Sequence, residues 1–213
     1  MNTVEWLSRE RTKADIFKCL SDCYYLPNGD LRATLDQLER RFECIYEEAV
    51  PFVVEMKAEL ESTTSFEPLE VDYARLFVGP YHLLAPPYGS VYLDGARQVM
   101  GDSTLDVIKN YREAGIDVNE EFTEPPDHIA AELEFIYFLI MKALESVADS
   151  DFRGAVKLSG RQRFFLERHL AAWVDEFTFN VEENADTRFY KNLARVTKLF
   201  VGWCLDDRRP ESS

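Results

Sequence analysis

The stretch IAAELEFIYFLIMKAL, residues 129–144, decides the fold of this chain. Apart from two glutamates and one lysine, its side chains are all apolar or aromatic. A helix that is apolar on nearly every side lies buried at the centre of a protein, because no face of it suits water. No apolar run in the chain reaches the roughly 18 residues that a membrane-spanning helix needs. We therefore expect this stretch to be the central helix of a helical protein that does not insert stably into a membrane.

Helical periodicity extends over most of the remaining chain, with apolar residues recurring every three or four positions. Pro51 should break or bend one of these helices, since proline removes an amide donor and clashes with the preceding turn. Ser103, with Asp106 three residues later, is expected to cap another, and Gly115 to end it. Strand-like alternation is confined to the short stretch SVYLD, residues 90–94. The helices predicted in this way cover residues 4–26, 31–60, 68–77, 104–115, 161–185 and 187–205.

These patterns predict an all-α helical bundle that forms a single domain over residues 1–213, with short connections between antiparallel neighbours. One long segment between the predicted helices lacks the signals that start and end a helix: GPYHLLAPPYGSVYLDGARQVMGD, residues 79–102. A loop longer than about 12–15 residues in a compact domain is usually functional or disordered. This one is rich in tyrosine, leucine and valine, so we expect it to be ordered and packed.

Charge and composition narrow the choice of partner. The chain has 39 acidic and 24 basic residues, a net charge of -15. Nucleic acid is an unsuitable partner, because its phosphates need a basic surface. A basic peptide is a suitable one, although such a charge also serves solubility alone. The N-terminus lacks the apolar core of a secretory signal, so we expect a soluble, intracellular protein. Its four cysteines, at positions 19, 23, 44 and 204, are expected to be buried free thiols.

The stretch EPPDHIAAELEF, residues 124–135, is the strongest candidate for a functional site. Its two prolines force an extended approach to the central helix. Asp127 then stands where a helix N-terminus favours an anionic acceptor, so it has a plain interpretation as the N-cap. His128 lies among free amides that disfavour a charged imidazole, and Glu132 follows one turn later. Together these side chains predict a polar cluster at the mouth of an apolar helix.

Three functions are compatible with this cluster. His128 could act as the general base of a hydrolase, although the sequence nominates no nucleophile for it. His128 and Glu132 could supply two metal ligands, although no metal-binding motif surrounds them. Alternatively, Asp127 and His128 could form one wall of a peptide-binding groove, with aromatic residues of the long loop as its apolar floor. The plain alternative for those aromatic residues is that they close the core.

Four motifs, in this order and spacing, resemble the TorD/DmsD family of cytoplasmic chaperones for molybdenum-cofactor oxidoreductases: YARLFVGP (residues 73–80), APPYGSVYLD (85–94), GDSTL (101–105) and EPPDHIAAELEF. The resemblance covers about residues 71–201. The Glu-Pro-x-Asp-His element is specific to the family when it follows the LF-x-GP loop. The stretch YGSVYLD, with GDSTL after it, is most similar to the DmsD branch, which often has tryptophan where this chain has Tyr88 and Tyr92.

The resemblance implies a chaperone without catalytic activity or cofactor. It would bind the twin-arginine signal peptide on the catalytic subunit of a molybdoenzyme of anaerobic respiration, of the dimethyl sulfoxide or trimethylamine N-oxide reductase type. That binding would hold the precursor in the cytoplasm until its cofactor is inserted. The resemblance also implies a monomer that can form a homodimer. Carried over by the motifs, the peptide-binding residues are Leu76, Phe77, Pro87, Tyr88, Gly89, Ser90, Tyr92, Pro125, Asp127 and His128.

Overall fold

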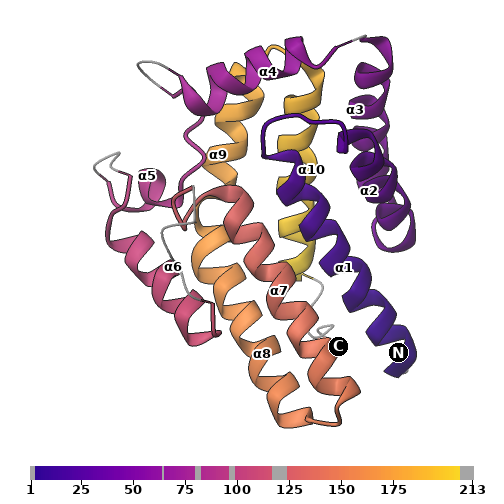
Figure 1. The fold of residues 1–213 in the computed structure, drawn as a ribbon, viewed down its shortest axis with the longest axis vertical. Helices are drawn as coiled ribbons and strands as arrows, with labels where there is room; N and C mark the ends of the chain where they lie inside the picture. Colours follow the sequence, from indigo (N-terminus) through magenta and orange to yellow (C-terminus); the bar gives the residue numbers. More distant parts are fainter. Residues whose placement is uncertain (1–2, 64, 80–82, 96–98, 117–123, 207–213) are drawn as a thin grey trace.

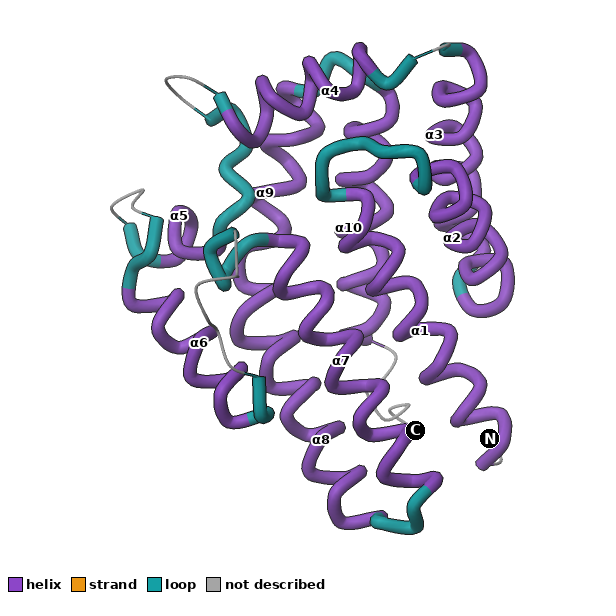
Figure 2. The backbone as a smooth tube through the Cα atoms, viewed as in Figure 1, coloured by secondary structure: helices purple, strands orange, loops and turns teal. Residues whose placement is uncertain are grey.

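The computed structural model describes residues 3–63, 65–79, 83–95, 99–116 and 124–206. Helices follow one another along the whole of this part of the chain, and no strand occurs in it, which confirms the predicted all-α class (Figures 1 and 2). The α-helices are α1 (Thr3–Cys23), α2 (Leu31–Ile45), α3 (Val50–Ser62), α4 (Glu67–Tyr73), α5 (Gly89–Leu93), α6 (Asp102–Glu113), α7 (Ile129–Ala148), α8 (Phe152–Phe165), α9 (Ala171–Asn184) and α10 (Arg188–Asp206). A 3-10 turn, η1 (Glu47–Ala49), and two π-helical turns, η2 (Ala74–Val78) and η3 (Leu166–Leu170), connect some of them.

The apolar stretch 129–144 lies in α7, which is the central helix as predicted. It packs chiefly against α1 and α8, on either side of it in Figure 1. Ile129, Leu133, Ile136 and Ile140 are fully buried, and they recur at the three-to-four spacing that places them on one face. Phe135 and its neighbours bury the other face. The central helix therefore gains apolar contacts on two sides, which explains why its sequence has so little polar surface.

The break before Pro51 is confirmed, because α2 ends at Ile45 and α3 begins at Val50, with Pro51 in its first turn. Prolines are tolerated there because the amides of the first turn have no helical partner. The stretch after α7 departs from the prediction. One nearly continuous helical run begins at Phe152, not at residue 161, and passes through η3 into α9 (Figure 1). The Asp151 carboxylate accepts a hydrogen bond from the Gly154 amide and starts this run.

Two local features differ from what the sequence patterns suggest. Residues 90–93 of the SVYLD stretch, whose alternation is strand-like, lie in the short helix α5, since so short an alternation does not specify a strand without a neighbouring strand. Helix α6 begins at Asp102, two residues earlier than a Ser103 cap allows. Its first turn is capped from a distance, because the Asp94 carboxylate accepts from both the amide and the hydroxyl of Ser103. Of the cysteines, all free, three are buried as expected, but Cys44 is exposed.

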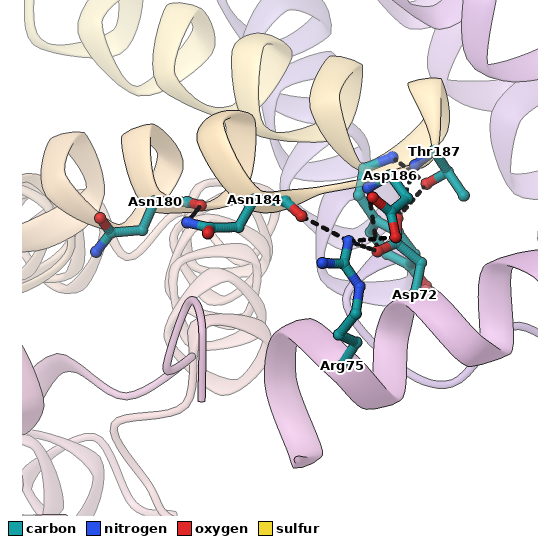
Figure 3. A network of polar contacts seen from close by, with 7 residues as sticks. Asp72, Arg75, Asn180, Asn184, Asp186 and Thr187 are labelled. Carbon is teal, nitrogen blue, oxygen red and sulfur yellow. Dashed lines mark hydrogen bonds and ion pairs between the residues drawn. The ribbon is translucent and has the colours of Figure 1, made fainter. Parts of the chain in front are cut away.

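A buried carboxylate ties α4 to the start of α10 (Figure 3). Asp72 accepts hydrogen bonds from the amides of Asp186 and Thr187 and from the Thr187 hydroxyl, at 2.7 to 3.2 Å. Arg75 donates to the other side of the same carboxylate at 2.8 Å and to the Asn184 carbonyl at 2.6 Å. This network fixes the segment that leads into the LF-x-GP motif against the last two helices. Among the described helices, none is long and apolar enough to cross a membrane.

Candidate functional site

A short antiparallel bridge brings the long loop and the EPPDH stretch together. Tyr88 and His128 face each other as an isolated bridge pair. The Gly89 amide donates to the Asp127 carbonyl at 2.9 Å, and the Ile129 amide donates to the Pro87 carbonyl at 2.8 Å. Residues far apart in the sequence therefore share one site at the N-terminal end of α7, as the resemblance implied.

Asp127 has a different capping role from the one considered above. Its Oδ2 accepts a hydrogen bond from the Ser90 amide at 2.8 Å, so it satisfies the first turn of α5 and not that of α7. Asp127 is 1% exposed, and its Oδ1 is buried with no partner among the described residues. The carboxylate thus acts as a clamp that holds α5 onto the start of the central helix.

His128 is the N-cap of α7. Its Nδ1 accepts a hydrogen bond from the Ala130 amide at 3.1 Å, which requires a neutral ring with its proton on Nε2. Tyr25 stacks on the ring with centroids 6.1 Å apart, and Tyr88 meets it edge-on at 5.5 Å. His128 is 2% exposed, and burial lowers its pKa to about 4. The ring is therefore an uncharged cap at neutral pH, because both burial and the helix dipole oppose protonation.

Glu132 faces Trp173 of α9, and not His128 as its spacing suggested. The indole Nε1 donates to Glu132 Oε2 at 3.1 Å, and Tyr92 stacks on the indole with centroids 5.4 Å apart. Burial raises the pKa of Glu132 well above its ordinary value, and the charge of Asp127 raises it further. A protonated Glu132 beside Asp127 is the less costly state of two carboxyl groups in a dry site.

Most of the predicted peptide-binding residues are gathered here but are inaccessible. Phe77 packs among the rings of Tyr24, Tyr73 and Phe177 in the core, and the Leu76 carbonyl accepts from the Ala85 amide. The expectation that these residues line an open groove is therefore corrected, because a side chain inside the core cannot also face solvent. Those that keep partly exposed surface are Tyr88, Tyr92 and Pro125, whereas Leu76, Phe77, Pro87, Gly89, Ser90, Asp127 and His128 are buried.

Sequence reasoning missed three side chains at the rim of this site. Tyr25 comes from the end of α1 and Tyr73 from α4, and both are close enough to Glu124 for its charge to affect them. Burial raises the pKa of Tyr88, and the Glu124 carboxylate raises it further. Tyr25 has no motif around it, whereas Tyr73 opens the YARLFVGP motif and Glu124 lies in the EPPDH stretch, so only these two had a signal in the sequence.

We expect Gly89→Ala to destabilise the protein by about 2 kcal/mol, the usual cost of overpacking a tight site. A β-carbon at position 89 would lie 3.0 Å from Trp173 Nε1 and 3.4 Å from Glu132 Oε1, so the indole or the carboxyl group would have to shift. The matched control is Gly29→Ala, because a β-carbon there meets nothing within 4 Å. Urea unfolding of both variants checks this. Equal stabilities would show that the indole and carboxylate move aside at no cost.

The geometry gives little support to the catalytic and metal alternatives. His128 Nδ1 is occupied as a helix cap, and the ring is sandwiched by tyrosines, so a substrate cannot approach it without rearrangement. Within the part of the chain that the structure describes, no three histidine, cysteine, aspartate or glutamate side chains are grouped so that they could hold a metal ion. What the site offers is a half-buried aromatic and acidic rim.

Residues 30–178, more than half of the chain, match the model of the family described as nitrate reductase delta subunit. Relatives include the Tat proofreading chaperone DmsD of Salmonella paratyphi A, 29% identical over 182 residues, with 83% of this chain and 80% of that one covered. The chaperone protein TorD of Shewanella loihica is 25% identical over 93% of this chain and 94% of its own length. The chain belongs to the TorD/DmsD family.

Other comparisons agree with this family. The Tat proofreading chaperone DmsD of Salmonella typhi is 32% identical over 67% of this chain, a match that spans 63% of that chaperone's length. A solved structure, a proposed redox enzyme maturation protein from Archaeoglobus fulgidus, superposes with a TM-score of 0.53 at 25% identity and covers 90% of this chain and 93% of its own. TorD/DmsD proteins are chaperones and maturation factors, so the predicted family and the predicted class of a chaperone without enzymatic activity are confirmed.

Proposed function

We propose that this chain, acting as a single domain in the cytoplasm, binds the twin-arginine signal peptide of a molybdoenzyme precursor and holds it until the cofactor is inserted. The relatives named Tat proofreading chaperone support this, since Tat denotes the twin-arginine export route. The DmsD branch is the favoured one, with a client of the dimethyl sulfoxide or trimethylamine N-oxide reductase type. A homodimer alongside the monomer is part of the proposal.

The observation that carries the proposal is the bridge between Tyr88 and His128. It joins APPYGSVYLD to EPPDHIAAELEF, two of the four motifs that carry the family resemblance, and brings the partly exposed Tyr88, Tyr92 and Pro125 to one end of α7. Tyrosine gives a peptide ligand a large contact area with little loss of conformational entropy, together with a hydroxyl for hydrogen bonding. The buried members of the predicted set then serve the site by fixing these side chains in place.

Charge complementarity supports the same partner. A twin-arginine peptide combines a cationic start with an apolar segment, and this chain has a net charge of -15. Electrostatic attraction raises the rate of association, while burial of the apolar segment sets the residence time. Glu124 at the rim is a carboxylate that an arginine can reach, unlike the buried Asp127.

We expect synthetic twin-arginine peptides from molybdoenzymes to bind with a Kd of about 1 µM, and the same peptides with both arginines replaced by glutamine to bind at least about tenfold more weakly. Isothermal titration at low and moderate salt measures both. Raising the ionic strength should weaken the binding of the arginine peptide and leave the binding of the glutamine peptide nearly unchanged. Failure of several such peptides to bind at about 100 µM would refute the proposed function.

A further inference from the structure

Next to the bridge lies a hollow of about 270 Å³ at the end of α1, which we call the acidic hollow. Tyr25, whose ring stacks on His128, forms part of its wall, so the hollow adjoins the site described above. Two carboxylates, Asp22 and Asp30, also line it. Its full lining is Asp22, Tyr25, Leu26, Pro27, Asn28, Asp30, Leu31 and Thr34.

A second hollow of about 270 Å³ lies along α7, and we call it the aromatic hollow. Apolar and aromatic surface dominates it, and Glu134 supplies the single charge among its lining residues. Phe135 and Phe138 stack with centroids 6.3 Å apart, which gives part of the wall a rigid aromatic surface. Its full lining is Tyr111, Ile116, Ala131, Glu134, Phe135, Tyr137 and Phe138.

One ammonium group links the two hollows. Lys18 Nζ lies 2.8 Å from Asp22 Oδ1 in the acidic hollow and 3.0 Å from Glu134 Oε1 in the aromatic hollow. Lys18 belongs to α1 and Glu134 to α7, which run side by side in Figure 1 and pack against each other. The two hollows are thus successive parts of one face, with an ion-paired lysine between them.

Charge sets these hollows apart from three others on the described part of the molecule. The acidic and aromatic hollows have three carboxylates and no cationic side chain among their lining residues. Each of the other three is lined by two cationic side chains, with one carboxylate in the first case and two in each of the others: Arg9 and Arg41 with Glu5; Arg32 and Lys57 with Asp36 and Glu61; Lys109 and Arg161 with Asp106 and Glu113. The lining charges of those three are therefore net positive or balanced, whereas those of the acidic and aromatic hollows are net negative, so a cationic ligand is attracted more strongly here.

We infer that the twin-arginine peptide lies across this face, with an arginine in the acidic hollow and its apolar segment in the aromatic hollow. The inference rests on the proposed function and adds the location and polarity of the bound peptide. The order of the two hollows matches the order of a cationic start followed by an apolar run. Asp22 and Glu134 have partly exposed side chains, so a guanidinium can reach them without opening the core.

Lys18 then occupies the position that the arginine of the peptide would take. Its ammonium pairs with the same two carboxylates that a guanidinium would use. The arginine must therefore displace the ammonium or share those carboxylates with it. A guanidinium can bind a carboxylate through two parallel hydrogen bonds, whereas an ammonium binds it as a point charge. Removal of the Lys18 charge therefore favours the peptide, while removal of the Glu134 charge disfavours it.

Titration of a twin-arginine peptide against two variants tests the inference. We expect Glu134→Gln to weaken binding about tenfold and Lys18→Gln to strengthen it about fivefold, both at low salt. The matched control is Asp36→Asn, because Asp36 is likewise an exposed carboxylate paired with a lysine, Lys57 at 2.5 Å, but at a hollow whose lining charges balance. The Asp36→Asn variant should bind the peptide with the same affinity as the unchanged protein. Thermal melting of each variant establishes that the fold is intact.

Cross-linking locates the apolar segment independently. A peptide with a photoreactive phenylalanine analogue in its apolar run should label the segment 131–138 of the intact chain, identified by mass spectrometry. Unchanged affinity in both charge variants, or labelling confined to other segments, overturns the inference while the peptide still binds, so the proposed function survives. A peptide that does not bind the unchanged protein refutes both.

Discussion

Replacement of Asp72 by alanine should lower the free energy of unfolding by about 3–5 kcal/mol, the cost of removing one partner from a buried charged network. The carboxylate is 2% exposed and accepts from two backbone amides and a hydroxyl at the start of α10 (Figure 3). The buried amide and hydroxyl of Thr187 would lose their acceptor, and Arg75 would lose its buried counter-ion. Urea unfolding monitored by tryptophan fluorescence measures the loss.

The same network contains its own control. Asp186 also pairs with Arg75, at 2.8 Å, but its side chain is 76% exposed. An exposed pair of this kind contributes at most about 1 kcal/mol, so Asp186→Ala should be nearly neutral. Asp72→Asn should fall between the two alanine variants, because the amide oxygen still accepts while the charge is lost. Equal losses for Asp72→Ala and Asp186→Ala would contradict the role of Asp72 as the buried carboxylate that ties α4 to the start of α10.

The fold was largely predictable because its strongest signals are local. The nearly all-apolar composition of residues 129–144 specifies burial wherever the helix is placed, and Pro51 limits a helix by its own covalent structure. The start of α6 could not be predicted in this way. The carboxylate that caps its first turn belongs to Asp94, which lies within the predicted long loop and not next to that turn in the sequence. Only the tertiary fold brings the two together.

The candidate site was predicted in part, for a related reason. The motifs identified the two segments that meet, but not which side chains face solvent, because exposure depends on what packs over them. Asp127 and His128 are both acceptors next to a helix start, and the sequence could not show that Asp127 caps α5 while His128 caps α7. Tyr25 contributes through stacking across the fold, so no spacing in the sequence signals its role.

Acidification from pH 7 to pH 5 should lower the free energy of unfolding by about 2 kcal/mol through His128 alone. Burial lowers the pKa of His128 from 6.5 to about 4 in the folded protein, whereas the unfolded chain titrates near 6.5. Within this window the unfolded chain binds a proton that the folded chain does not, so stability is lost as the pH falls. The geometry gives the same sign, since a proton on Nδ1 would face the Ala130 amide at the positive end of α7.

The His128→Asn variant isolates this contribution. Asparagine is a good N-cap acceptor and does not titrate, so the variant keeps the cap and loses the pH dependence. Other titrating groups cancel in the difference between the two proteins, including Glu132, whose raised pKa has the opposite sign and removes stability as the pH rises. Urea unfolding at pH 7, 6 and 5 measures this difference. Between pH 7 and pH 5 the free energy of unfolding of the variant should rise by about 2 kcal/mol relative to that of the unchanged protein. Parallel pH profiles would mean that folded His128 accepts a proton as readily as the unfolded chain, and its place as a buried neutral cap would have to be abandoned.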